Sequence, residues 1–95
     1  MNENICLEYT ANRLKYKLVK ADRLKKDQIK AIYSVWADDE ALPRGYEVHI
    51  VRQTIDKFGL RWNNPKNEDF GDCGWFYLDV VKAGHRYISI LPQKG

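Results

Sequence analysis

The sequence has few of the residues that mark a disulfide scaffold, a metal centre or a membrane anchor. Its 95 residues include only two cysteines, Cys6 and Cys73, which lie far apart in the chain. Two cysteines form no disulfide framework, so a reduced protein in the cytoplasm is expected. No apolar run approaches the roughly 20 residues of a membrane-spanning helix. The first residues also lack the basic start and apolar stretch of a signal peptide, and no membrane partner is expected.

Repeats, low-complexity tracts and interdomain linkers are also lacking. Hydrophobic residues make up 44% of the chain and charged residues 31%, a balance that excludes a disordered protein. Residues 1–95 are therefore expected to form a single domain with one core. The net charge of +3 permits an anionic partner without requiring one. The sequence leaves the oligomeric state open.

Alternating apolar and polar residues predict two strands at the start of the chain. Leu14, Tyr16 and Leu18 alternate with cations, which is typical of a half-buried strand. Glu8, on the preceding strand, is expected to pair with one of these cations across the hairpin. A helix that includes residues 13–21 is the alternative, because some of the same apolar residues also share a helical stripe.

The stretch between Gly45 and Gly59 predicts a central amphipathic helix. At about 100° per residue its apolar residues gather on one side, and Gly59 is suited to the left-handed stop after a helix. Ile55 lies on that side, so Ile55→Ala is expected to cost about 2–5 kcal/mol. The polar side carries groups that can bind phosphates, bases or carboxylates. These residues are His49, Arg52, Gln53 and Lys57.

Another helix is expected before the central one, capped by Asp22 or Asp27 and ending near Ala37. Residues 60–74 have no periodicity and several chain-breaking residues, so they predict a long loop. Trp62 and Phe70 are expected to hold that loop against the core.

Residues 75–81 and 86–91 predict a second hairpin with a basic tip between its strands. The resulting order is strand, strand, helix, helix, strand, strand. It predicts a small α+β domain in which two helices pack on a four-stranded antiparallel sheet. An alternative follows from the C-terminal half, whose layout resembles a winged helix-turn-helix. The central helix would then be the recognition helix, and residues 82–86 would form the wing.

The last hairpin contributes the other candidate binding residues. Trp75, Tyr77 and Tyr87 are expected to form an aromatic patch flanked by Lys82 and Arg86. His85, at the hairpin tip, is a further candidate binding residue. Aromatic rings with interleaved cations are what single-stranded nucleic acid stacks on, and they are also common at protein interfaces.

Catalytic and metal signatures are weak. His49 and His85 are spaced in no known motif, although a small ribonuclease toxin would need one of them in a basic cleft. The acidic group of Asp69, Asp72, Cys73 and Asp79 matches neither a calcium loop nor a zinc site. No catalytic residue, metal or cofactor is therefore predicted.

The expected function is non-enzymatic nucleic-acid binding by the central helix and the basic hairpin tip. The alternative is a compact inhibitor or adaptor, of the kind that phage and mobile elements encode, which binds a host nucleic-acid-processing protein. A ribonuclease toxin is the second alternative.

Overall fold

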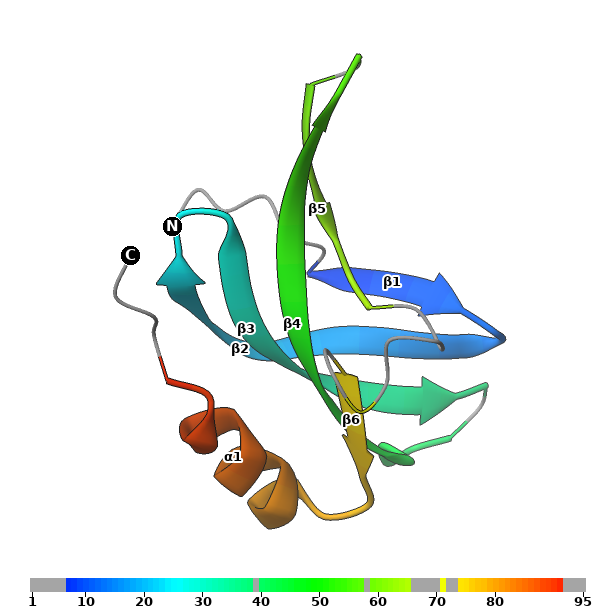
Figure 1. Ribbon diagram of the computed structural model, residues 1–95. Helices are drawn as coiled ribbons and strands as arrows, with labels where there is room; N and C mark the ends of the chain where they lie inside the picture. The colour runs from blue at the N-terminus through cyan, green and yellow to red at the C-terminus, as the bar shows by residue number, and fades with distance from the viewer. Residues whose placement is uncertain (1–6, 39, 58, 66–70, 72–73, 92–95) are drawn as a thin grey trace.

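The computed structural model describes residues 7–38, 40–57, 59–65, 71 and 74–91. These residues form one curled sheet and one helix (Figure 1). The elements are β1 (Glu8–Ala11), β2 (Leu14–Lys25), β3 (Gln28–Ala37), β4 (Gly45–Asp56), β5 (Gly59–Asn63), β6 (Gly74–Tyr77) and α1 (Val80–Ser89).

The strands run antiparallel in the order β1-β2-β3-β4-β5, and β6 joins the same sheet. One edge of β4 pairs with β3 along most of its length. The opposite edge is divided, because residues 46–49 pair with β6 and residues 52–56 pair with β5. β4 is therefore the strand through which three other strands are connected.

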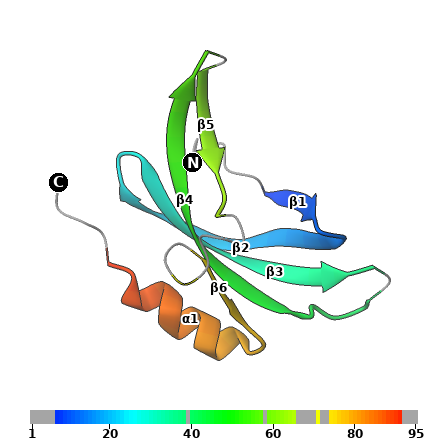
Figure 2. The ribbon, with the colours of Figure 1, turned by 45° about the vertical axis from the view of Figure 1, so that its right-hand side comes forward.

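The inner face of the sheet encloses the larger core. Ile29 and Tyr33 of β3 are fully buried there. Tyr9 of β1 meets Tyr33 edge-on, with ring centroids 5.3 Å apart, and Trp62 of β5 packs against the same cluster. Strands from the two ends of the sheet thus meet over β3, which gives the half-barrel curl seen in Figure 2.

A second core lies on the outer face of the sheet, beneath α1. Ala83 and Tyr87 of the helix pack against Ile32 of β3 and Val48 of β4. Ala83 and Tyr87 are four residues apart in sequence, which places them on one side of a helix. The helix therefore covers β3 and β4 at the end of the sheet where β6 joins.

Gly45 allows β6 to approach β4 closely. A Cβ atom at this position would lie 2.8 Å from the carbonyl oxygen of Tyr77. Side-chain carbons do not approach backbone oxygens so closely in folded proteins, and a backbone atom of a paired strand cannot easily move away. Glycine is therefore required at position 45, where β4 lies against the end of β6.

The predicted N-terminal hairpin is confirmed. β1 and β2 pair around a turn in which Asn12 and Arg13 both have positive φ angles, as a two-residue hairpin turn requires. Tyr16 is buried, and Lys15 forms the expected ion pair with Glu8 at 3.6 Å. The alternative helix that includes residues 13–21 is wrong, because most of these residues belong to β2. The alternation of apolar and polar residues, typical of a strand with one buried face, predicted this segment correctly.

The predicted helix between Gly45 and Gly59 is wrong, because this segment is β4. The residues from Gly45 to Val51 are all buried or half-buried, since the inner core covers one face of the strand and α1 covers the other. A strand buried on both faces shows no alternation, and its apolar residues fell by coincidence at helical spacing. Ile55, predicted to be buried, is 79% exposed. Gly59 does have a positive φ, but it is the first residue of β5, directly after the turn that follows β4.

The predicted helix ending near Ala37 is wrong for the same reason. Gln28–Ala37 is β3, which is nearly continuously buried, and Asp22 lies within β2 rather than at a helix cap. The predicted strand at residues 86–91 and the hairpin tip before it are also wrong, because most of this segment belongs to α1. The two-helix α+β fold and the winged-helix alternative therefore both fail, and the protein is mostly β.

Part of the predicted loop at residues 60–74 is a strand. β5 occupies its beginning, where Leu60, Arg61 and Trp62 pair with β4. Trp62 packs against the core as expected, whereas Phe70 lies outside the described residues. Within the part of the chain that the structure describes, no helix is long and apolar enough to cross a membrane.

Two isoleucines of this sheet should respond differently to truncation. Ile29 is fully buried, and Ile55 is 79% exposed. Ile29→Ala should therefore lower the free energy of unfolding by about 2–5 kcal/mol. Ile55→Ala should lower it by less than about 0.5 kcal/mol, as is usual for surface positions. Urea denaturation followed by circular dichroism measures both values, and a similar large loss for the two variants would contradict the extended β4.

Candidate functional site

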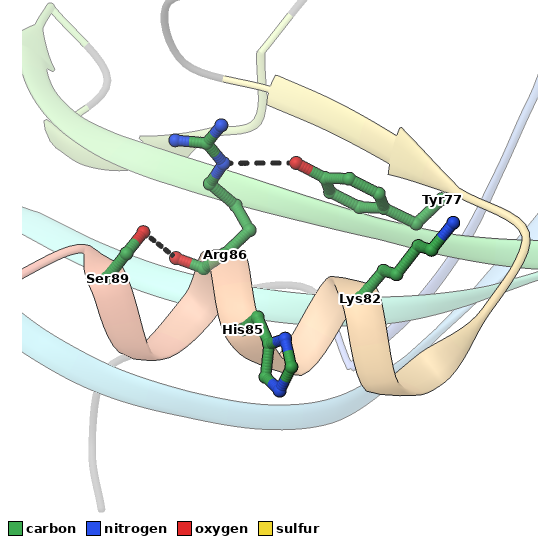
Figure 3. Close-up of a pocket in the computed structure, with 5 residues that line it drawn as sticks. All are labelled: Tyr77, Lys82, His85, Arg86 and Ser89. Carbon is green, nitrogen blue, oxygen red and sulfur yellow. Dashed lines mark hydrogen bonds between the residues drawn. The ribbon is translucent and has the colours of Figure 1, made fainter.

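A shallow basic depression lies between α1 and the end of β6. Its volume is about 400 Å³, and it opens to solvent. Among the described residues, its lining contains no acidic side chain. The lining residues are Tyr77, Lys82, His85, Arg86 and Ser89, which we call the α1 basic pocket (Figure 3).

Arg86 is the most firmly held cation of the α1 basic pocket. Its Nε donates a hydrogen bond of 3.0 Å to the hydroxyl of Tyr77. Its guanidinium lies 4.9 Å from the ring centroid of Trp75, within the range of a cation–π contact. No hydrogen bond from its terminal nitrogens to another described residue is present. A guanidinium fixed in this way can present its two-pronged donor edge to a phosphate or carboxylate with little further loss of side-chain freedom.

Lys82 and His85 complete the polar lining. Figure 3 shows Lys82 and Arg86 extending from one side of α1 towards Tyr77, while His85 projects from an adjoining side. Lys82 is exposed and adds a mobile point charge beside the fixed guanidinium. His85 is exposed but is not directed at the same point, so the pocket is better suited to binding an anion than to paired acid–base chemistry.

The orientation of the pocket depends on how α1 begins and ends. At its start, the Asp79 side chain accepts a hydrogen bond of 2.7 Å from the backbone N–H of Val81, which satisfies a free donor of the first turn. Ala83 and Tyr87 face the sheet. Arg86 lies in the last turn, where a cation interacts favourably with the negative end of the helix dipole. Asp79, considered in the sequence with Asp69, Asp72 and Cys73 and not predicted to bind metal, is this helix cap, whereas the other three residues lie outside the described residues. Among the described residues, no group of His, Cys, Asp and Glu could hold a metal.

At the other end of α1, a buried lysine binds the last backbone carbonyls. Lys30 of β3 donates hydrogen bonds of 2.8 Å to the carbonyl of Tyr87 and 2.9 Å to that of Ile90. Burial lowers the pKa of Lys30, although the nearby Asp22 carboxylate opposes this effect. The Tyr87 hydroxyl donates to the same Asp22. Tyr87 is buried among these contacts, and burial followed by the Asp22 hydrogen bond raises its pKa. Tyr87 therefore anchors the helix to the sheet rather than facing solvent.

The structure brings together the candidate binding residues of the predicted last hairpin, although a strand and a helix carry them instead of two strands. Trp75 and Tyr77 come from β6, and Tyr87, Lys82 and Arg86 come from α1. The aromatic rings do not form an open platform, since Trp75 is half-buried beneath the helix. A stacking surface for successive bases is thus not available at this place.

The residues predicted for the polar side of the central helix are separated. Neighbouring residues of a strand point to opposite faces, so Arg52 points to the outer face while His49 and Gln53 point to the inner one. His49 is only 1% exposed, and Lys57 is exposed near the turn that follows β4. The pairing of Arg52 and Gln53 on one surface is therefore wrong.

His49 belongs to a buried polar network on the inner face. Its Nε2 lies 2.8 Å from Glu47 Oε1, and its Nδ1 lies 3.1 Å from Asn64 Nδ2. Tyr16 donates to the other Glu47 oxygen at 3.4 Å. The Asn64 amide N–H is placed to donate to Nδ1, which leaves Nε2 to donate to Glu47. The network joins β2, β4 and the chain after β5, and its burial suits a structural role.

Residues of β5 and the helix anchor were not found by sequence reasoning. Arg61 and Asn63 lie in a segment that was predicted to be a loop, yet Leu60–Asn63 alternates between apolar and polar residues. The contact of Lys30 with the end of α1 was not predicted, because a lysine inside an apolar run is usually expected to face solvent. The N-cap Asp79 followed by apolar residues at helical spacing was the signal that could have revealed α1.

The buried Tyr16 predicts a loss of stability at high pH. Burial raises its pKa from 10.0 to about 12, and the adjacent Glu47 carboxylate adds to this effect. Its contribution is complete below the unfolded pKa of about 10 and is lost as the pH rises towards about 12. At about 1.4 kcal/mol per pKa unit, the loss is about 3 kcal/mol.

Tyr16→Phe tests this prediction, because phenylalanine does not ionise. From about pH 10 to about pH 12, the free energy of unfolding of Tyr16→Phe should fall by about 2–3 kcal/mol less than that of the wild type. Urea denaturation at a series of pH values gives both curves. Parallel curves would show that Tyr16 ionises equally well in the folded and unfolded chains.

Comparison with known proteins adds no relative. No protein-family model, curated protein or solved structure matches this chain.

Proposed function

We propose that this protein binds nucleic acid without catalysing a reaction, and that the α1 basic pocket holds backbone phosphates. The observation that carries the proposal is the fixed guanidinium of Arg86, which lies between the Tyr77 hydroxyl and the Trp75 ring. Such a group suits an oxyanion, and the neighbouring Lys82 increases the positive charge at the same point. The net charge of +3 favours approach to a polyanion.

A protein partner is the second candidate, in keeping with an inhibitor or adaptor. Val81 is 58% exposed and Ile88 is 68% exposed, and both lie on α1 beside the pocket. Exposed apolar groups next to an arginine and aromatic rings are frequent at protein interfaces. Val81 and Ile88 share one side of α1, but they do not line the pocket, and the cations of the pocket make nucleic acid the better match. Capture of a protein from lysate that survives nuclease treatment would favour the second candidate.

Binding should respond to salt and to the pocket cations. Arg86→Ala and Lys82→Ala should each weaken binding and lower the slope of log K against log salt by roughly one unit, because each removes about one phosphate contact. Fluorescence anisotropy with labelled DNA and RNA, from low salt to about 0.15 M, measures the effect. Circular dichroism checks that each variant remains folded.

Arg13→Ala is the matched control, since it removes the same charge at the turn between β1 and β2. Figures 1 and 2 both place that turn at the opposite end of the molecule from α1. Arg13→Ala should leave the salt slope unchanged. Absence of binding to all nucleic acids at low salt, or equal losses for Arg13→Ala and Arg86→Ala, would overturn the proposal.

A further inference from the structure

The sheet continues as a two-stranded arm beyond its last pairing with β3. The final pair between β3 and β4 joins Gln28 to Arg52. The backbone N–H of Gln53 still donates a hydrogen bond of 2.8 Å to the carbonyl of Asp27. Beyond Gln53, β5 is the strand of the described residues that pairs with β4, through to the Asp56–Gly59 pair. Figure 1 shows the far end of the resulting hairpin projecting away from the rest of the molecule, while Trp62 near its base packs against the inner core. We call this hairpin, residues 52–57 and 59–63, the β4–β5 arm.

One face of the β4–β5 arm is polar and carries side chains suited to reading base edges. Arg52 pairs with Asn63, and Thr54 pairs with Arg61, so these four residues share a face. All four are exposed. Asn63 Nδ2 donates a hydrogen bond of 2.8 Å to Thr54 Oγ1, which ties the two strands together. Arginine recognises guanine and asparagine recognises adenine through paired hydrogen bonds in the major groove.

The polar face of the arm lies on the same side of β4 as α1. Val48 packs under the helix, and alternate residues further along the strand, including Arg52 and Thr54, continue the same face. At about 3.3 Å per residue, Thr54 lies about 20 Å from Val48. One ligand can therefore contact the arm and the α1 basic pocket together only if it extends over about this length, as a nucleic-acid duplex does.

We infer that the partner is double-stranded DNA in the B form. The β4–β5 arm enters the major groove with its polar face towards the bases, while the α1 basic pocket holds the neighbouring backbone. This inference rests on the proposed function and names its ligand class. A major groove about 12 Å wide admits a two-stranded ribbon. Two arginines on one face, Arg52 and Arg61, provide the matching positive charge.

Other nucleic acids match the surface less well. Single-stranded chains are bound mainly by base stacking on open aromatic rings, and here Trp75 is covered by α1 and Tyr87 is buried. The major groove of double-stranded RNA is deep and narrow, so a ribbon cannot reach its bases. The duplex of DNA alone offers both the wide groove and the regular backbone.

The test compares three probes of one mixed sequence: a 16-base-pair DNA duplex, one of its single strands, and the RNA duplex. Wild-type protein should bind the DNA duplex at least about tenfold more tightly than the other two probes. Arg61→Ala and Arg52→Ala should each weaken binding to the DNA duplex by roughly five- to hundredfold. Neither should change binding to the single strand by more than about twofold, since the groove contact is absent there.

Two further variants separate groove contacts from charge and from folding. Ile55→Ala alters the opposite face of the same arm, and it should leave the affinity for duplex DNA unchanged. Arg61→Lys keeps the charge but loses the paired donors, so it should recover only part of the lost affinity. Circular dichroism confirms that each variant is folded.

The outcomes distinguish this inference from the proposed function. If Arg86→Ala weakens all three probes but the arm variants change none, the duplex inference is overturned and phosphate binding by α1 stands. If the wild type binds the three probes equally, the inference is likewise overturned. If it binds none at low salt, both proposals fail. A large loss from Ile55→Ala alone would also overturn the inference, because it would assign the opposite face of the arm to the partner.

Discussion

Burial of β4 on both faces is the constraint on which the rest of the structure depends. On the inner side, Val51 joins the aromatic core and His49 joins Glu47 in a hydrogen-bonded network. On the outer side, Val48 supports α1. The strand also pairs with β3 along one edge and with β5 and β6 along the other. Without two-sided burial, neither the curl of the sheet nor the position of the helix would be determined.

Both proposed contact surfaces follow from this arrangement. β6 pairs with the first half of β4 and delivers the chain to Asp79, where α1 begins. Lys30 then fixes the last carbonyls of the helix against the sheet, and Arg86 is held over β6. The second half of β4 extends past β3 with β5 as its partner. The α1 basic pocket and the β4–β5 arm are therefore positioned by the two halves of β4, and the length of that strand sets the distance between them.

The sequence allowed prediction of the parts of the fold that are buried on one side only. In β2, exposed cations alternate with inward residues such as Tyr16, so the first hairpin was predicted correctly. β3 and β4 were taken for helices, because two-sided burial removes the alternation and leaves runs such as Ile29–Val35 nearly uniform in burial. α1 was missed because its β-branched residues and Gly84 have low helix propensity, and packing of Tyr87 against the sheet outweighs that preference. Lys82 and Arg86 could be identified as candidates from their charge. Arg61 and Asn63 were missed because the alternation of Leu60–Asn63 is short and because their shared face depends on pairing with β4.

The central claim is that α1, β6 and the β4–β5 arm form one surface for duplex DNA. Backbone amide shifts in a titration with a short DNA duplex, followed by nuclear magnetic resonance, test this claim most directly. The account predicts that the largest changes fall on residues 74–77, 82–89 and 52–63, while the turn between β1 and β2 remains unchanged. Changes confined to that turn, or spread evenly over the sheet, would contradict it.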